Sequence, residues 1–116
     1  ILNKWCRQTA VLPHADVFIQ HGGNNSFNES LYFGIPPIVM PFVWDGHDNA
    51  RRANDTKHGI GMPRYDWRDE ELLSNIERVL NDEEMRANVK ATSEYMQAQD
   101  GRMRAANAIN DLLTSL

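Results

Sequence analysis

The sequence contains a single cysteine, no long apolar run and no excess of positive charge, and each lack excludes a class of protein. With Cys6 alone, the chain has no internal disulfide and no zinc or iron–sulfur site built from several cysteines. No apolar run approaches the ~18 residues that a membrane-spanning helix requires. The formal net charge of −4 gives no basic surface for nucleic acid. We therefore expect no membrane span, no nucleic-acid partner and, because one cysteine suits a reducing compartment, a cytoplasmic location.

An initiator methionine is also missing, because the sequence begins with Ile1. We therefore expect a fragment of a longer protein. The 116 residues, of which 41% are hydrophobic, suit one compact domain rather than two. The expected organisation is a single domain over residues 1–116.

The part of the chain before Pro63 is rich in glycine, proline and short apolar runs, and it predicts alternating strands and helices. The β-branched and aromatic run at 17–20 predicts a buried strand. Residues 24–33 predict a helix that ends at Gly34, and residues 38–40 predict a second strand. A strand, a helix and a strand at this spacing form a βαβ unit, which belongs to a parallel sheet.

Polar residues and proline predict how the first helical segments begin and end. Asn24, Asn25 or Ser26 is the expected side-chain N-cap of the helix over 24–33. A short helical turn over residues 9–12 is expected before the first strand, with Pro13 ending it.

The rest of the chain predicts helices over residues 48–57, 69–80, 82–99 and 103–113, with a break at Gly101 and a short third strand or extended piece at Ile60. The positions expected to face the core of the last three helices are Leu72, Leu73, Ile76, Val79 and Leu80, then Met85, Val89 and Met96, then Ala106, Ile109 and Leu113.

Two or three strands against about five helices make a small α/β sheet with an unpaired edge and an uncovered face. We interpret the chain as the second half of a doubly wound, Rossmann-like domain with flanking helices. The missing strands would come from an absent N-terminal stretch or from a partner. Exposed apolar surface at that edge predicts self-association of the isolated chain.

The junction between the first strand and its helix has the composition of an anion site. Gly22 and Gly23 let the backbone approach a phosphate closely. The amides of Asn25 and Ser26 at the start of the helix can donate to phosphate oxygens. His21 adds a side-chain donor, and ligands of open α/β sheets bind at this edge.

A carboxylate one turn into the helix, Glu29, can accept hydrogen bonds from two neighbouring hydroxyls such as those of a ribose. The junction matches neither of the common phosphate loops, because GxxxxGK[ST] and GxGxxG are both absent. The sequence thus predicts an anion site with a sugar-binding carboxylate beside it.

The residues around this junction resemble the donor-binding signature of family 1 glycosyltransferases, which comprise the UDP-glycosyltransferases and their macrolide-glycosylating relatives of the GT-B fold. Upstream, Trp5 and Gln8 resemble the W-x-P-Q element of the family, with Arg7 in place of its proline. The resemblance covers residues 5–61, roughly half the chain. The positions that match the signature are His21, Gly23, Asn25, Ser26, Glu29, Gly34, Pro36, Pro41, Asp45, Asn49 and Ala50.

The resemblance implies that this region binds a nucleotide sugar, and it gives roles to some of its residues. Trp5 would stack on the base and Gln8 would lie near the base edge, while Glu29 would bind the ribose hydroxyls. The diphosphate would be held by His21, Gly23, Asn25 and Ser26.

For the sugar itself, the resemblance implies Asp45 as the residue that binds hydroxyls, with Trp44 lining the pocket. The family usually has glutamine after this aspartate, whereas this chain has Gly46. One side chain that would bind sugar hydroxyls is therefore missing, so the sugar preference stays open. The choice between UDP and TDP as the nucleotide stays open as well.

Members of this family invert the anomeric centre and need no divalent metal, so the resemblance implies no metal and no cofactor. In the family, the base and the acceptor pocket lie in the N-terminal domain, which we expect to be absent from this chain. The implied function is the donor-binding part of an inverting glycosyltransferase that transfers a hexose from a UDP- or TDP-sugar to an acceptor hydroxyl. Its implied partner is an N-terminal acceptor-binding domain or a partner subunit, and the isolated chain is expected to be inactive.

Two other functions fit part of the sequence. A non-catalytic module or subunit that binds nucleotide sugars remains an alternative. A phosphate-binding hydrolase is disfavoured, because it explains neither Glu29 nor the proline spacing. The spacing of His14, His47 and His58 matches no metal motif, so we expect incidental histidines.

Overall fold

The computed structural model describes residues 3–116 and has an α/β fold built on a parallel sheet of three strands. The strands β1 (Phe18–Gln20), β2 (Pro37–Val39) and β3 (Ile60–Gly61) lie in the order β1-β2-β3. In the register, Ile38 of β2 pairs with Ile19 on one side and with Ile60 on the other. The predicted βαβ unit and the third strand at Ile60 are therefore confirmed.

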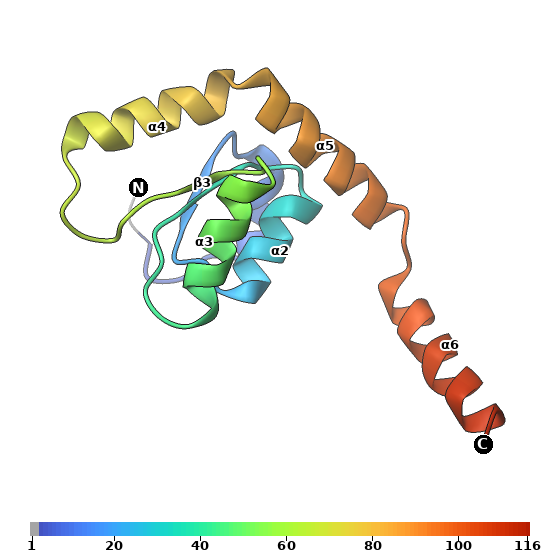
Figure 1. Cartoon of the computed structure of the whole chain (residues 1–116). Helices are drawn as coiled ribbons and strands as arrows, with labels where there is room; N and C mark the ends of the chain where they lie inside the picture. The colour runs from blue at the N-terminus through green and yellow to red at the C-terminus, as the bar shows by residue number, and fades with distance from the viewer. Residues whose placement is uncertain (1–2) are drawn as a thin grey trace.

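Helices cover the sheet on both faces. The chain contains α1 (Gln8–Val11), a 3₁₀ turn η1 (Leu12–His14), α2 (Asn24–Tyr32), α3 (Asp45–Asp55), α4 (Asp69–Asn81), α5 (Glu83–Gln97) and α6 (Gly101–Thr114). In Figure 1, α2 and α3 lie side by side, while α4 crosses the opposite side of the sheet. Among residues 3–116, no helix is both long enough and apolar enough to cross a membrane.

The two faces of the central strand β2 are buried in two different clusters. Ile38 packs with Val79 of α4 and Met85 of α5, whereas Val39 packs with Phe27 of α2 and residues of α3. Ile38 and Val39 both have an exposed fraction of 0%. Because side chains alternate along a strand, one step along β2 moves from one layer to the other. This two-sided burial is typical of a parallel strand.

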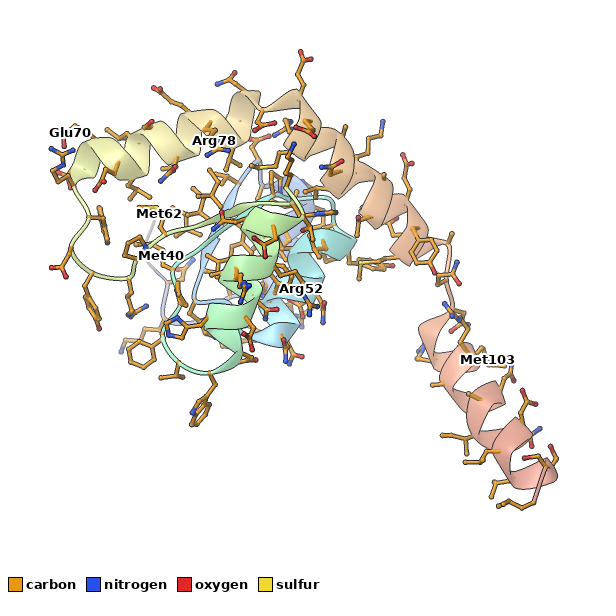
Figure 2. All side chains as sticks on the ribbon, viewed as in Figure 1. Met40, Arg52, Met62, Glu70, Arg78 and Met103 are labelled. Atoms are coloured by element: carbon orange, nitrogen blue, oxygen red, sulfur yellow. The ribbon has the colours of Figure 1, made fainter. Side chains whose placement is uncertain are left out.

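Two methionines extend the layer between the sheet and α4. Figure 2 shows Met40, which follows β2, beside Met62, which follows β3. Met62 is buried in the cluster around Ile38, and Met40 packs against that cluster. The flexible thioether side chains thus fill the space beneath α4 near the carboxyl ends of the strands.

The expected edge of the sheet is present at β1, which pairs only with β2 within the described residues. Ile19 of β1 is 43% exposed, although its register partner Ile38 is fully buried. The face that α4 covers over β2 is therefore left open over β1, as the small number of strands predicted.

Two helices begin differently from the prediction. The N-cap of α2 is Gly23, which has no side-chain cap bond, so the expectation of Asn24, Asn25 or Ser26 is wrong. The helix α3 begins at Asp45 rather than at residue 48. Trp44 precedes it with φ 43° and ψ −119°, and this sharp turn starts the helix early.

The turn before β1 also runs further than predicted. The helical path continues from α1 into η1 and includes Pro13, so proline does not end it. Proline lies in the first turn of η1, where its missing N–H has no intrahelical acceptor to lose.

In α4 and α5, part of the expected inward face is confirmed. Val79, Met85 and Val89 are buried. Leu73 and Leu80 are instead 60% and 39% exposed, so their predicted burial is wrong. The apolar stripe of α4 is wider than the strip of helix that contacts the sheet. Three further predicted positions, Leu72, Ile76 and Met96, are half-buried.

The last helix contradicts the prediction of an inward face. Ala106, Ile109 and Leu113 are all exposed, because α6 extends away from the rest of the chain (Figure 1). The predicted break between the last two helices is present at residues 98–100, and Gly101 is the first residue of α6. The side chain of Asp100 caps α6 by accepting from the amide of Met103 at 3.1 Å. The periodicity identified an apolar face, but within residues 3–116 nothing packs against it.

Candidate functional site

The carboxyl ends of β1 and β2 lead into α2 and α3, and a pocket of about 420 Å³ opens between these two helix starts. Ligands of open parallel sheets bind at this edge. The residues that line the pocket are His21, Gly23, Asn24, Asn25, Ser26 and Asp45. All of them except Asn24 were predicted from the sequence as ligand contacts.

The loop between β1 and α2 depends on glycine. Gly22 is buried with φ 88°, a conformation that favours glycine. A Cβ on Gly22 would lie 2.6 Å from Cγ1 of Val39 and 2.9 Å from Cα of Gly46. A Cβ on Gly23 would lie 2.6 Å from Nε2 of His21, so the imidazole stands directly beside the loop. The missing side chains let the loop fold back tightly against α3 and place His21 at the pocket.

The start of α2 presents backbone donors to the pocket. The first backbone bond of the helix runs from the amide of Phe27 to the carbonyl of Gly23 at 3.0 Å. The amides of Asn24, Asn25 and Ser26 therefore have no intrahelical acceptor. Such amides, with the partial positive charge of the helix N-terminus, attract anions.

Asp45 supplies the acceptor for one of these amides from the neighbouring helix. Its Oδ2 accepts a hydrogen bond from the backbone N of Asn24 at 3.2 Å. Asp45 is half-buried and is the first residue of α3. The first amide of α2 is thus satisfied by a tertiary contact with Asp45 and not by a side chain of α2 itself.

A second group of predicted residues meets one turn further along α2. Nε2 of Gln8 donates to Oγ of Ser26 at 3.1 Å and to Oε2 of Glu29 at 2.6 Å. Gln8 belongs to α1, so the segment before β1 lies against α2. Ser26 also lines the pocket, so its hydrogen bond with Gln8 connects Gln8 and Glu29 to the predicted anion site.

The two tryptophans that were predicted to contact the ligand do not line the pocket. Trp5 is 76% exposed and Trp44 is 86% exposed, and neither lines the cavity. Trp44 has φ 43°, which is uncommon for a residue with a side chain and indicates local strain. Their predicted roles at the base and at the sugar stay predictions.

Sequence reasoning missed the roles of Asn24 and Asn49 in this site. Nδ2 of Asn49 donates to the carbonyl of Gly22 at 2.7 Å and to Oδ1 of Asn24 at 2.9 Å. Asn49 is 5% exposed and lies one turn after Asp45 on α3. The spacing of Asp45 and Asn49 in the signature was the available signal, because residues four apart share a helix face.

The structure gives Gly46 a packing role. It is buried, and a Cβ there would lie 2.7 Å from the carbonyl oxygen of His21. A side chain at this position requires the loop after β1 to shift. The replacement of the usual glutamine therefore accompanies a close backbone contact between α3 and this loop.

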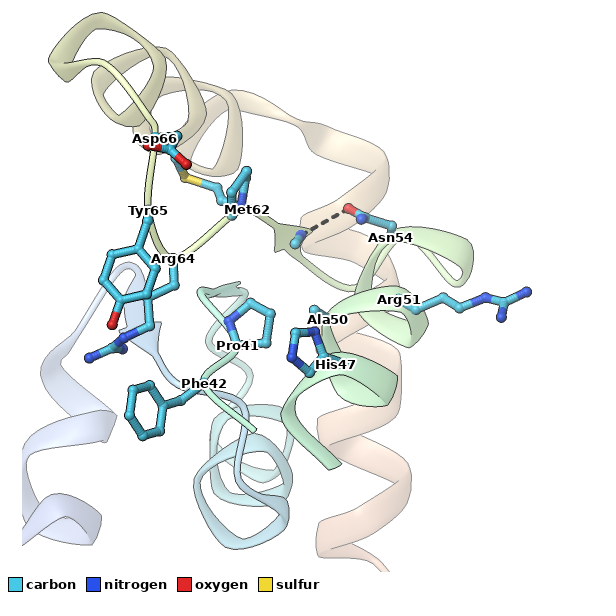
Figure 3. A pocket seen from close by; sticks show the side chains of 12 residues that line it. Pro41, Phe42, His47, Ala50, Arg51, Asn54, Met62, Arg64, Tyr65 and Asp66 are labelled. Carbon is cyan, nitrogen blue, oxygen red and sulfur yellow. Dashed lines mark hydrogen bonds between the residues drawn. The ribbon is translucent and has the colours of Figure 1, made fainter. Parts of the chain in front are cut away.

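A second cavity of about 570 Å³ lies on the other side of α3, beyond the ends of β2 and β3 (Figure 3). The guanidinium of Arg64 lies 4.5 Å from the centroid of the Phe42 ring and 5.7 Å from that of Tyr65. Figure 3 shows His47 facing this cavity, with Asn54 bonded to the amide of Gly61. None of the predicted donor-binding residues lines it.

Within residues 3–116, no three His, Cys, Asp or Glu side chains come together in a way that could hold a metal ion. The predicted incidental histidines lie apart. His14 is exposed, His47 lines the second cavity, and Nε2 of His58 lies 2.7 Å from Oγ1 of Thr92. His58 thus links the end of α3 to α5.

Relatives and solved structures resemble this chain over most of its length. The NDP-glycosyltransferase YjiC of Bacillus subtilis (strain 168) is 31% identical over 102 residues, which is 88% of this chain and 26% of that protein. The structure of the glycotransferase of kitacinnamycin has a TM-score of 0.88 and 27% identity, covering 96% of this chain and 29% of the other. The glycosyltransferase VinC shares the fold, with a TM-score of 0.75 and 18% identity, over 83% of this chain and 24% of its own.

The chain therefore spans about a quarter of the length of the YjiC protein that it matches. The family model described as UDP-glucoronosyl and UDP-glucosyl transferase matches residues 1–101. This range includes the whole pocket, both glycine contacts and α2 to α5. The chain belongs to the UDP-glucoronosyl and UDP-glucosyl transferase family.

Proposed function

We propose that this chain is the nucleotide-sugar donor-binding part of an inverting glycosyltransferase, which transfers a hexose from a UDP- or TDP-sugar to an acceptor hydroxyl. The observation that carries the proposal is the pocket between the starts of α2 and α3, where helix amides, His21 and Asp45 converge. The family description names UDP-sugar transferases, and the structure of VinC was solved in complex with dTDP. Both support a nucleoside diphosphate as the ligand.

The proposed position of the diphosphate is the start of α2. The amides of Asn25 and Ser26 have no intrahelical acceptor, and His21 stands beside Gly23 at the same opening. Donors fixed in this way stabilise the negative charge that develops on a departing diphosphate. We expect this stabilisation to need no divalent metal.

The ribose is proposed to bind at Glu29, where a carboxylate can accept from two hydroxyls. This carboxylate accepts a hydrogen bond from Gln8 at 2.6 Å. Gln8 therefore orients Glu29 and shares it with the ribose, and the base would lie further out toward Trp5. Asp45, which lines the pocket, would receive the sugar hydroxyls.

In the proposed reaction, an acceptor hydroxyl loses its proton to a base and its oxygen bonds to the anomeric carbon as the bond to the diphosphate breaks. The base is proposed to lie in an N-terminal acceptor-binding domain or a partner subunit. This chain would hold the donor and receive the charge of the leaving group. We expect it to bind the nucleotide without catalysing transfer by itself.

Calorimetric titration with UDP, TDP and GDP tests the proposal. We expect saturable binding of UDP or TDP by the chain, and loss of at least about tenfold in affinity in His21→Ala and in Glu29→Ala, which remove charge-assisted contacts. His14→Ala and Glu77→Ala are the matched controls, because both residues are exposed and lie outside the pocket. Equal affinities in all four variants, or no binding by the folded chain, would overturn the proposal.

A further inference from the structure

The loop that carries His21 and Gly23 is attached to α3 by one buried side chain. Asn49 is 5% exposed, and both hydrogens of its amide group are used, one on the carbonyl of Gly22 and one on Oδ1 of Asn24. The two acceptors lie on either side of Gly23, at 2.7 and 2.9 Å from Nδ2. Asn49 itself does not line the pocket.

The buried carbonyl of Gly22 requires a hydrogen-bond donor, and Asn49 supplies it. Gly22 is buried with φ 88°, and its carbonyl would have no partner among the described residues without Asn49. A buried carbonyl without a donor is costly, so the loop would rearrange to reach water. The close contact of Gly22 with Cα of Gly46 holds the same loop against the same helix. The loop thus keeps its conformation because α3 supplies the amide donor of Asn49 and, at Gly46, a backbone without a side chain.

We propose that Asn49 is a positioning residue for the diphosphate: it acts through Gly22 and Asn24 to aim the first amides of α2 and the His21 side chain into the pocket. The inference rests on the proposed function of this pocket. Asn49 touches neither the diphosphate nor the sugar. Its removal is expected to affect ligands that carry phosphate and to spare those that do not.

The first arm of the test needs no ligand. Amide hydrogen exchange is measured in the unmodified chain and in Asn49→Ala for two amides that have acceptors, Asn24 on Asp45 and Phe27 on the carbonyl of Gly23. We expect at least about tenfold faster exchange in the variant, since the loop loses one buried and one partly buried hydrogen bond. The matched control is Asn54→Ala, because Asn54 lies on the same helix and bonds the amide of Gly61 at 2.9 Å. Equal exchange in Asn49→Ala and Asn54→Ala would overturn the inference whatever the chain binds.

The second arm compares UDP with uridine. For Asn49→Ala we expect UDP affinity to fall about tenfold while uridine affinity changes by less than about twofold, because the base and ribose contacts do not pass through the loop. A structural role alone would weaken both ligands in parallel, and that result would overturn the inference. If the unmodified chain binds neither UDP nor TDP, the proposed function fails, and the exchange arm still decides whether Asn49 orders the loop.

Asn24→Ala supplies a second variant in case Asn49→Ala does not fold. It removes only one acceptor of Asn49 and leaves the bond to Gly22 in place. We expect a smaller increase in the exchange of the Phe27 amide, and no increase beyond that of Asn49→Ala when the two substitutions are combined. Full additivity of the two substitutions would contradict the coupling that the contact implies.

Discussion

The carboxylate of Asp45 accepts a hydrogen bond from the backbone N of Asn24, with 3.2 Å between Oδ2 and N. A residue at the start of α3 therefore occupies one donor of the helix end that we propose for the diphosphate. The acidic side chain complements the partial positive charge of α2, which has no acidic residue of its own in its first turn. A phosphate that binds here approaches this carboxylate and is repelled by it.

The first prediction concerns that repulsion. Asp45→Asn keeps the shape of the side chain and its oxygen acceptor but removes the charge. We expect UDP to bind about threefold more tightly to this variant, and the gain to shrink at high salt, which screens the charge. A UDP-sugar should bind less tightly, because its hydroxyls lose a charged acceptor. Calorimetry with both ligands measures this change of preference, and a parallel loss for both would contradict it.

A second prediction concerns the bridge that Gln8 makes to Ser26 and Glu29. Gln8→Ala removes the donor to both side chains, so we expect the free energy of unfolding to fall by about 1 kcal/mol. UDP affinity should fall as well, because Glu29 is no longer oriented. Thr9→Ala is the matched control, since Thr9 is the exposed next residue of α1. Urea denaturation of both variants measures the difference, and equal midpoints would show that the bridge contributes nothing.

A third prediction uses two glycines in opposite environments. Gly46→Ala places a Cβ 2.7 Å from the carbonyl oxygen of His21, so we expect a loss of about 1–3 kcal/mol in the free energy of unfolding and weaker UDP binding. In Gly101→Ala, the added Cβ meets no other atom within 4 Å, and the residue lies at the start of α6. This control should stabilise the helix by up to about 1 kcal/mol. Thermal unfolding compares the two, and a neutral Gly46→Ala would refute the close contact.

A fourth prediction concerns the apolar face of α6. Ile109 and Leu113 are 62% and 65% exposed, so Ile109→Ser and Leu113→Ser should leave the melting temperature of the protein unchanged. The face of α6 adds exposed apolar surface to that of the open sheet edge, so both variants should also reduce self-association. Analytical ultracentrifugation over a range of concentrations measures this. Val89→Ala, at 0% exposure, is the contrast and should lower the melting temperature.

The parts of the fold that follow from local chemistry were predictable. The apolar runs of β1 and β2, Gly34 after α2 and the helical spacing of α4 each act over a few residues, and the βαβ unit follows from them. The composition of the β1–α2 junction likewise predicted most of the pocket lining.

The features that were missed depend on partners distant in the sequence. The first amide of α2 donates to Asp45, which lies 21 positions after Asn24, and no local rule for N-caps can find this acceptor. The amide of Asn49 reaches Gly22, 27 positions earlier. The exposed face of α6 shows the converse, because periodicity reveals an apolar face but not whether anything covers it.

The alternation along β2 has a consequence for how this part of the molecule tolerates change in length. Ile38 and Val39 are neighbours in the chain but belong to different layers, and Asp45 follows only six positions after Val39. Insertion or deletion of one residue in β2 would exchange the two layers and turn every later side chain of the strand to the wrong face. The same step would shift Asp45, Gly46 and Asn49 by one position relative to α2. The phase of a three-residue strand therefore sets both the core and the alignment of the binding pocket.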